Sequence, residues 1–377
     1  MAELKLTTLN AEWLEFSAGV DIGWIQPNQP IFIGRAPTLA EAKERMEALS
    51  TLISEIAPDI LFICEGVKGA AHMGAFVEKH LPDYELITHP ADDDKLYSIR
   101  GDQWLWFMVR KDHLGLLNPS LLNNTTWKAF VSSQEEGHSD GKWMVSVPQI
   151  KDGKLLPNIR DAHEHFRHPQ VLVLEPTGGR IDIIGVHLKS KLVSDQPRKR
   201  RPDEDFESYA KLKKVAIYLA GSQIARTKLT TEATDVRYYI ERRFEQEPEP
   251  SIFVVGDVND GPGKELLERE YLFHDLISNL QGDIFFAERF LNHALFDFPD
   301  HLRWTVQFDD LIDPDRPREI LLDHIMFTQA LSGNGRGPLR VPPKGGLVEH
   351  EIHERIASLF PGRLSDHRPV SVKLVER

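Results

Sequence analysis

Short runs of apolar, largely β-branched residues recur along the whole chain and predict a series of strands. The runs lie at residues 4–9, 60–64, 104–109, 171–175, 181–186, 252–255, 320–327 and 370–374. Each has the length of a strand rather than of a buried helix. Helical patterns separate several of these runs, and no internal repeat is visible. We therefore expect sheets flanked by helices.

Apolar residues spaced three and four apart predict a helix at 38–56, between the first two strands. The apolar positions are Leu39, Ala42, Met46, Leu49 and Ile53. Thr38 is suited to cap the first turn because Glu41 follows three residues later, as in a capping box.

The remaining segments are less regular. A charged stretch at 206–244 is expected to be mostly helical and to break near Thr230-Thr231. Residues 118–157 and 332–346 lack periodicity and are expected to be long loops, the first rich in Ser, Asn and Gly and the second in Gly and Pro. We expect one domain spanning residues 1–377, in which such loops select the substrate.

Several strands end in polar side chains that can do chemistry. These are Asn10, Glu65, His187, the Asp257–Asn259 turn and the Asp366-His367 pair. Taken singly, each has an ordinary structural explanation: Asp and Asn favour turns, an amide can cap a segment, and a strand histidine is most often a hydrogen-bonded structural residue. Glu65 is harder to explain, because a glutamate after a buried strand is rarely left unpaired.

The order of these groups along the chain resembles the endonuclease/exonuclease/phosphatase superfamily. Its members include exonuclease III-like repair nucleases, pancreatic-type deoxyribonuclease, sphingomyelinases and inositol polyphosphate 5-phosphatases. The matching positions run nearly end to end: Asn10, Glu65, His187 in Val-His-Leu-Lys-Ser, Gly256-Asp257-Val258-Asn259, Leu322-Asp323-His324-Ile325 and Ser365-Asp366-His367, with Arg167 a looser match. Val258, His324 and Cys64 depart from the family pattern without removing a functional group. The resemblance implies an α+β fold, a four-layer α/β/β/α sandwich of two packed mixed β-sheets.

Phosphate ester hydrolysis needs a held anion, neutralised charge and an oriented water. A hard cation serves the first two needs, and Mg²⁺ prefers oxygen ligands. We expect Mg²⁺, for which Mn²⁺ can substitute, on Glu65, Asp366 and Asn10. The other expected roles are Asp257 as base or water orienter, Asn259 as its hydrogen-bonding partner, His187 and His367 as donors to phosphoryl oxygens, Asp323 as the partner of the His367 ring, and Arg167, Lys189 and Asn10 in substrate binding.

A zinc site is a poor match to this sequence. Cys64 is the only cysteine, and the cluster His163, His165 and His168 lacks the His-Glu-x-x-His spacing of zinc hydrolases. We expect that cluster to be a solvated loop near the mouth of the site.

The charge of the chain does not identify the substrate. The net charge of −13 argues against a protein that coats polyanions, although a local basic patch can still bind a phosphate backbone. The candidate patch is Lys189 to Lys191 followed by 198–201, but 203–205 is acidic and cancels much of it. The tryptophans suit base stacking or, more commonly, core packing.

The sequence thus predicts a metal-dependent phosphodiesterase or nuclease acting on a phosphate ester, with DNA or RNA as candidate substrates. A phosphatase or phosphodiesterase for a small-molecule or lipid-headgroup ester is the alternative, and a catalytically silent binding module is a third. The single cysteine, the absence of a signal-like start and the lack of a long apolar run predict a cytoplasmic protein without a membrane span. Nothing in the sequence points to an obligate protein partner.

Overall fold

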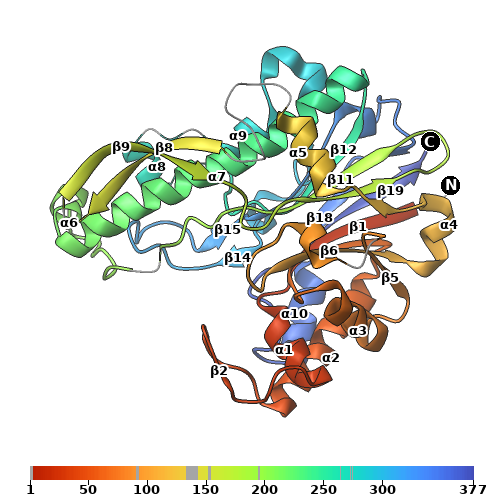
Figure 1. Cartoon of the computed structure of the whole chain (residues 1–377), viewed down its shortest axis with the longest axis horizontal. Coiled ribbons are helices and arrows are strands. Elements are labelled where there is room, and N and C mark those ends of the chain that lie inside the picture. Colours follow the sequence, from red (N-terminus) through yellow and green to blue (C-terminus); the bar gives the residue numbers. More distant parts are fainter. Residues whose placement is uncertain are drawn as a thin grey trace.

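The computed structural model describes residues 3–90, 93–132, 143–151, 154–193, 196–263, 265–271, 273 and 275–377. Its core is a pair of mixed β-sheets (Figure 1). The seven-stranded sheet has the order β17 (Leu339–Arg340), β19 (Val370–Glu376), β1 (Glu3–Asn10), β4 (Ile60–Gly66), β6 (Trp104–Arg110) and β5 (Tyr84–Ile87), with β18 (Gly346–Val348) also on β19. The six-stranded sheet has the order β13 (Asn292–His293), β16 (Asp323–Phe327), β12 (Ser251–Asp257), β11 (Ile181–His187), β10 (Gln170–Leu174) and β7 (Ser120–Leu121).

Each sheet combines one parallel pair with antiparallel neighbours. The parallel pairs are β1 with β4 and β11 with β12. Because β1, β4, β11 and β12 end in Asn10, Gly66, His187 and Asp257, the polar groups predicted from the sequence come together at strand ends. The predicted strand at 320–327 is divided into β15 (Glu319–Ile320), which pairs with β14 (Val306–Gln307), and β16.

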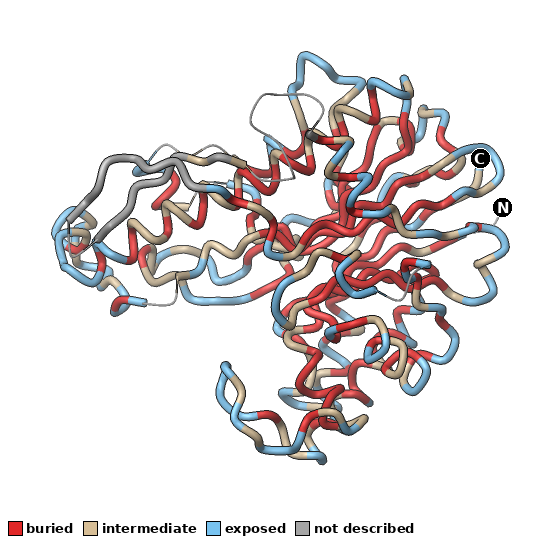
Figure 2. Tube along the Cα trace, in the orientation of Figure 1, coloured by how far each residue is buried: buried red, intermediate tan, exposed pale blue. Residues whose placement is uncertain are grey.

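Apolar layers on both faces of each sheet give the predicted four-layer sandwich. The layer between the sheets contains Phe62, Phe107, Ile183, Phe253 and Ile325, which are fully or almost fully buried. Figure 2 shows the buried residues concentrated in the central strands. Helices α1 (Leu14–Ile22), α2 (Leu39–Ile56) and α3 (Ala70–His80) cover the outer face of the first sheet, and α10 (His350–Leu359) packs on α2. Helices α5 (Asn124–Ser132), α7 (Lys213–Gln246) and α9 (Leu276–Gln281) cover the second.

The predicted capping box is present at the start of α2. The Thr38 hydroxyl accepts the Glu41 N–H at 3.2 Å, and the Glu41 carboxylate accepts the Thr38 N–H at 3.0 Å. This reciprocal pairing satisfies two backbone donors that no helix turn can satisfy. The helix at 38–56 is confirmed.

The predicted break near Thr230-Thr231 is wrong. Helix α7 continues through both threonines to Gln246, and the interruption lies at residues 211–212, after α6 (Phe206–Ala210). The Thr231 hydroxyl bonds the Thr227 carbonyl at 2.8 Å, so the β-branched side chain is satisfied inside the helix. Buried contacts made by the same turns outweigh the low helix propensity of threonine.

Residues 118–157 are not one long loop. They contain β7, α5, β8 (Trp143–Lys151) and the start of β9 (Lys154–His163), while 133–142 and 152–153 lie outside the described residues. The β8–β9 hairpin packs along α7 to form an arm that projects from the sandwich (Figure 1). Segment 332–346 is mostly irregular, as predicted, and contains β17 and the first residue of β18.

The remaining elements are short. They are β2 (Pro30–Ile31), β3 (Gly34–Arg35), α4 (Leu114–Leu117), α8 (Leu266–Glu270) and the 3₁₀ turns η1 (Asp94–Tyr97), η2 (Lys111–His113), η4 (Ile284–Arg289), η5 (Asp300–Leu302) and η6 (Gln329–Leu331). No helix within the described residues is long and apolar enough to cross a membrane.

The histidine cluster is buried, so its prediction as a solvated loop is wrong. The His165 ring bonds Asp235 of α7 at 2.9 Å, and His163 bonds Glu232 of α7 at 3.1 Å. The Glu232 carboxylate also accepts the Lys189 N–H at 2.7 Å, two residues after His187. The cluster therefore fixes the arm to the strand that carries a candidate site residue.

Replacing Asp235 with alanine should lower the free energy of unfolding by about 3–5 kcal/mol, because it leaves buried His165 without its partner. Burial lowers the pKa of His165, but Asp235 and Glu232 raise it overall. Burial raises the pKa of Asp235 and of Glu232, but the histidines lower both overall.

The pH dependence has a defined sign. The contribution of His165 to the free energy of unfolding is fully present below its unfolded pKa of about 6.5. This contribution is lost as pH rises through its raised folded pKa. Asp235 and Glu232 stabilise the folded state fully above their unfolded pKa of about 4. Their stabilisation is lost as pH falls through their lowered folded pKa. Urea unfolding should thus show the largest loss for Asp235→Ala between about pH 4.5 and 6.5. A loss that is the same at every pH, or no larger than that of exposed Asp112→Ala, would contradict this.

Candidate active site

A cavity of about 630 Å³ opens where the strand ends of the two sheets meet the root of the arm. Its walls include most of the predicted site residues: Glu65, Arg167, His187, Asp257, Asn259, Asp366 and His367. Asn10, Lys189 and Asp323 are not among the described residues that line it. The fold thus brings most of the predicted residues to one cavity, and it separates residues on the cavity surface from residues that do not line it.

Glu65 points into the cavity because its strand is bulged. The register of β4 on β6 shifts between Ile63 and Gly66, and Glu65 has a left-handed φ of 54°. A bulge of this kind re-aims one side chain without ending the strand. The carboxylate accepts hydrogen bonds from the Asn10 amide at 3.2 Å and from the Trp13 N–H at 3.1 Å.

Asn10 joins the two sheets at the site. Its amide nitrogen donates to Glu65 and, at 3.0 Å, to Asp257, and its carbonyl oxygen accepts the Glu12 N–H at 3.0 Å. These bonds use both ends of the amide. They support a positioning role, and the metal and substrate contacts expected for Asn10 stay predictions.

The Asp257–Asn259 turn converges on the cavity through backbone geometry rather than strand alternation. β12 ends at Asp257, and Asn259 has a left-handed φ of 56°. The Asp257 carboxylate accepts the Asn259 N–H at 2.8 Å, and the Asn259 amide donates to the Leu188 carbonyl at 2.9 Å. Gly256 has φ of 124°, and a Cβ there would lie 2.1 Å from the Val186 carbonyl oxygen, so only glycine fits.

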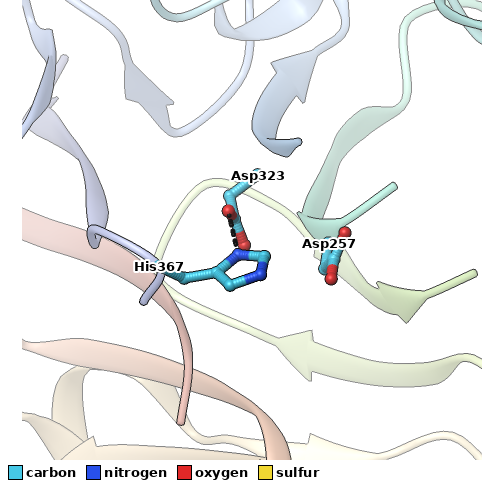
Figure 3. Close-up of side chains that lie close together, drawn as sticks. All are labelled: Asp257, Asp323 and His367. Carbon is cyan, nitrogen blue, oxygen red and sulfur yellow. Dashed lines mark hydrogen bonds and ion pairs between the residues drawn. The ribbon is translucent and has the colours of Figure 1, made fainter. Parts of the chain in front are cut away.

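His367 and Asp323 form a buried ion pair at the edge of the cavity. The His367 Nδ1 atom lies 2.7 Å from an Asp323 oxygen, and the other ring nitrogen faces Asp257 (Figure 3). Burial lowers the pKa of His367, but Asp323 more than offsets this and raises it to about 10. At neutral pH His367 is therefore a cation with one N–H available to the cavity.

His187 and Asp257 have shifted pKa values in keeping with proton transfer. Burial, with Arg167 and His367 nearby, lowers the pKa of His187 well below its usual range. Burial and the Asp323 charge raise the pKa of Asp257 to about 7. One histidine is thus neutral and the other charged, beside a carboxylate poised near neutral pH.

Three carboxylates that line the cavity lie near enough to influence one another electrostatically. Glu12 and Asp366 line it together with Glu65, and burial followed by the charges of Asp366 and Glu65 raises the pKa of Glu12. Arg45, 3.8 Å from Glu12, offsets only part of this negative charge. An excess of carboxylate oxygens around open space is the donor set that a hard divalent cation needs.

Sequence reasoning missed Glu12 and Trp13. Both have left-handed φ values, 44° and 55°, and such residues cost about 1–3 kcal/mol each where no contact compensates them. The Glu12 N–H bonds Asn10, the Trp13 N–H bonds Glu65, and Arg45 bonds the carbonyls of Ala11 and Glu12. The signal in the sequence was proximity to Asn10. The turn that directs Glu12 and Trp13 to the cavity contains no glycine or proline from which it could be predicted.

Arg167 is the cation best placed to meet a substrate anion. It donates to the carbonyls of His187 at 3.0 Å and Leu188 at 2.9 Å, and to the Gln103 side chain at 2.5 Å. These acceptors are neutral, so the bonds orient the guanidinium without cancelling its charge, and two of its five N–H groups stay available. Lys189 does not line the cavity and its ammonium group bonds the Ser190 carbonyl, so its substrate role stays a prediction.

The predicted basic patch at 198–201 is neutralised by neighbouring carboxylates. Arg198 pairs with Glu204 at 2.6 Å, Lys199 lies 3.7 Å from Asp309, and Arg201 lies 3.9 Å from Asp203. Arg200 bonds the carbonyls of Ile312 and Glu204. The alternative explanation, a charged surface that is internally paired, therefore describes this patch better than a phosphate-binding surface.

The deep wall of the cavity is also internally paired. Lys191 bonds Asp260, Glu265 and Glu268, and Arg226 bonds the two glutamates. Arg316 pairs with Glu265 at 3.0 Å and with Asp310 at 3.2 Å. The three acids around Lys191 are grouped closely enough to hold a metal ion, but the ammonium group already occupies the space among them.

Comparisons with known proteins give remote structural similarities. Comparisons with protein-family models and with curated protein sequences gave no match. Among solved structures, truncated TDP2 of Caenorhabditis elegans is 14% identical with a TM-score of 0.48, and the alignment covers 99% of this chain and 97% of that one. An endonuclease/exonuclease/phosphatase from Bacteroides vulgatus is 12% identical with a TM-score of 0.47, and both chains are fully covered. The two mixed sheets and their covering helices form the predicted four-layer sandwich, and the chemistry of this chain rests on its own residues.

A third similar structure is TDP2 of D. rerio complexed with a single-strand DNA product, with 11% identity, a TM-score of 0.46 and full coverage of both chains.

Proposed function

We propose that this chain is a divalent-metal-dependent phosphoesterase, and specifically a phosphodiesterase. The observation that carries the proposal is the cavity in which carboxylates face a protonated and a neutral histidine. Glu12, Glu65 and Asp366 supply negative charge to the cavity, and His367 and Arg167 supply positive charge. Such a site can hold a cation and a phosphate group together.

Three of the chain's own groups have geometries suited to moving protons and stabilising charge. Asp257, with a pKa raised to about 7, is placed to accept a proton from an attacking water. Asn259, held by the Leu188 carbonyl, has its amide oxygen available to orient that water. Protonated His367 is placed to donate to a phosphoryl oxygen as negative charge grows, and Asp323 keeps it charged.

The donor set fits Mg²⁺ or Mn²⁺. Glu65 and Asp366 would hold the ion, with Glu12 contributing directly or through water, since Mg²⁺ keeps several waters and takes few carboxylates. When bound, such an ion neutralises phosphate charge and lowers the pKa of coordinated water.

The wall residues bear on the kind of ester. Acidic residues on the cavity surface outnumber cationic ones: Glu12, Glu65, Asp257, Glu265, Asp309, Asp310 and Asp366 against Arg167, Lys191, Arg226, Arg316 and protonated His367. A long polyanion gains little from cations that carboxylates already neutralise. This favours a compact ester or the end of a single strand over duplex DNA, and it keeps a small-molecule phosphate ester as the second candidate.

Hydrolysis by the purified chain with Mg²⁺, Mn²⁺ or EDTA tests the proposal. The panel contains bis-p-nitrophenyl phosphate, p-nitrophenyl phosphate, a 5′-labelled single-stranded oligonucleotide, plasmid DNA and sphingomyelin. We expect metal-dependent turnover of the synthetic diester and of the oligonucleotide, faster than of plasmid DNA. Turnover confined to the monoester or to sphingomyelin would move the function to the second candidate, and silence on every substrate with both metals would favour the binding module.

A further inference from the structure

An aromatic rim adjoins the carboxylates that line the cavity. Trp13 lines the cavity, and its backbone N–H bonds Glu65. The Phe32 ring lies 4.8 Å from the Trp13 ring at 68°, and the Phe16 ring lies 6.0 Å from it at 27°. We call Trp13 and Phe32 the aromatic rim. It places two aromatic side chains, one of which lines the cavity, beside the group that we propose as a metal ligand.

Phe32 is a large apolar side chain that is mostly exposed to solvent. It lies with Ile33 between β2 and β3, at the tip of a hairpin that projects from the sandwich (Figure 1). The two residues are 69% and 50% exposed, although Ile31 of the same hairpin packs against a buried cluster that contains Phe16. Apolar side chains grouped at the mouth of a pocket commonly mark a ligand contact.

The indole N–H of Trp13 limits the kinds of ligand that suit the aromatic rim. Within the described part of the chain, the indole groups of Trp24, Trp104, Trp106, Trp127 and Trp143 donate to carboxylates or carbonyls. The indoles of Trp13 and Trp304 make no such bond to a described residue, and of these two Trp13 is the one that lines the cavity. An acyl chain on this surface would cover the N–H without an acceptor, whereas a heteroaromatic ring offers both a face and acceptor atoms.

We infer that the aromatic rim binds the base of a nucleoside whose phosphate enters the cavity. The inference rests on the proposed function and names its substrate class as nucleoside phosphate esters. A base is neutral, so it suits an acidic cavity in which the paired cations leave little attraction for additional phosphates. Stacking on Trp13 with Phe32 at its edge would orient the ester toward Asp257 and His367.

Calorimetric titration of the full chain in Mg²⁺ tests this without requiring turnover. The ligands are thymidine 5′-monophosphate, 2-deoxyribose 5-phosphate, which has no base, and a short-chain phosphatidic acid. We expect the nucleotide to bind about tenfold more tightly than the sugar phosphate, a typical gain for one stacked base. Phe32→Ala and Trp13→Leu should each remove most of this preference.

The matched control is Phe285→Ala, since Phe285 is 90% exposed on η4 and outside the cavity lining. It should leave the preference intact. Equal affinity for nucleotide and sugar phosphate in the unmodified chain, or a preference that survives both rim variants, would overturn the inference. Tighter binding of the phosphatidic acid that is lost in the rim variants would assign the rim to a lipid instead. Failure of hydrolysis across the substrate panel would refute the proposed function and leave the calorimetric result to be judged on its own.

Discussion

Replacement of His367 with alanine is expected to lower kcat for bis-p-nitrophenyl phosphate by about 100- to 1,000-fold, the usual effect of removing one donor to a developing oxyanion. The substitution removes the cation that faces the cavity. It also leaves Asp323 buried without its partner, so the variant loses stability as well as activity. The measurement is steady-state hydrolysis in saturating Mg²⁺.

Two controls separate chemistry from folding. His301→Ala changes an exposed histidine outside the cavity and should keep full activity. His367→Gln retains a side chain that can bond Asp323, so a folded but inactive protein, judged by thermal unfolding, would assign the loss to the missing charge. Activity near that of the unmodified chain in a folded His367→Gln protein would refute the assigned role.

Asp257 and His367 set the expected pH dependence of the activity. Activity should fall on the acid side as Asp257 is protonated near pH 7, and on the alkaline side as His367 loses its proton near pH 10. A bound cation nearby would move the acid limb lower. His367→Gln should abolish the alkaline limb and keep the acid limb.

Glu65→Gln is expected to raise the Mg²⁺ concentration for half-maximal activity by about 10- to 100-fold or more, the range known for weakened metal shells. Glutamine keeps the size of the side chain and an acceptor for one of its two donors, Asn10 or Trp13, but it removes the negative charge that a hard cation prefers. The measurement is a Mg²⁺ titration of activity, with calorimetric Mn²⁺ binding as a readout that does not depend on turnover.

Glu207→Gln is the matched control, because the Glu207 side chain is 82% exposed and pairs only at the surface with Lys211. Its metal titration should overlay that of the unmodified chain. If Glu65→Gln shows unchanged Mn²⁺ affinity and an unchanged Mg²⁺ requirement, Glu65 is not a metal ligand.

The predictions that succeeded depend on local rules. Apolar runs define the strands, and the Thr38–Glu41 box defines the start of α2, because both are written in neighbouring residues. The candidate site residues were chosen by a local rule too, their position at strand ends, and parallel pairing of β1 with β4 and β11 with β12 brings several of these ends together.

The predictions that failed depend on contacts distant in sequence. Helix α7 passes through Thr230 and Thr231 because Glu232 and Asp235 on the following turns bind histidines about 70 residues earlier. The same contacts bury the histidine cluster. Glu12 reaches the cavity through a left-handed turn held by Asn10 and Arg45, which no periodicity reports.

The basic patch shows a different limit. The segment 198–201 reads as four consecutive cations, and proximity to His187 suggested a phosphate grip. Whether these cations are free to bind phosphate depends on partners from elsewhere in the chain, such as Asp309 for Lys199 and the Ile312 carbonyl for Arg200. Only the fold brings these partners close.

The most direct test of the central claim compares the unmodified chain with Asp257→Asn on bis-p-nitrophenyl phosphate, each with Mg²⁺ and with EDTA, beside exposed Asp300→Asn as control. The account predicts turnover that requires Mg²⁺, falls by about 100-fold or more in Asp257→Asn and is unchanged in Asp300→Asn. Turnover that persists in EDTA, or that Asp257→Asn retains in full, would contradict it.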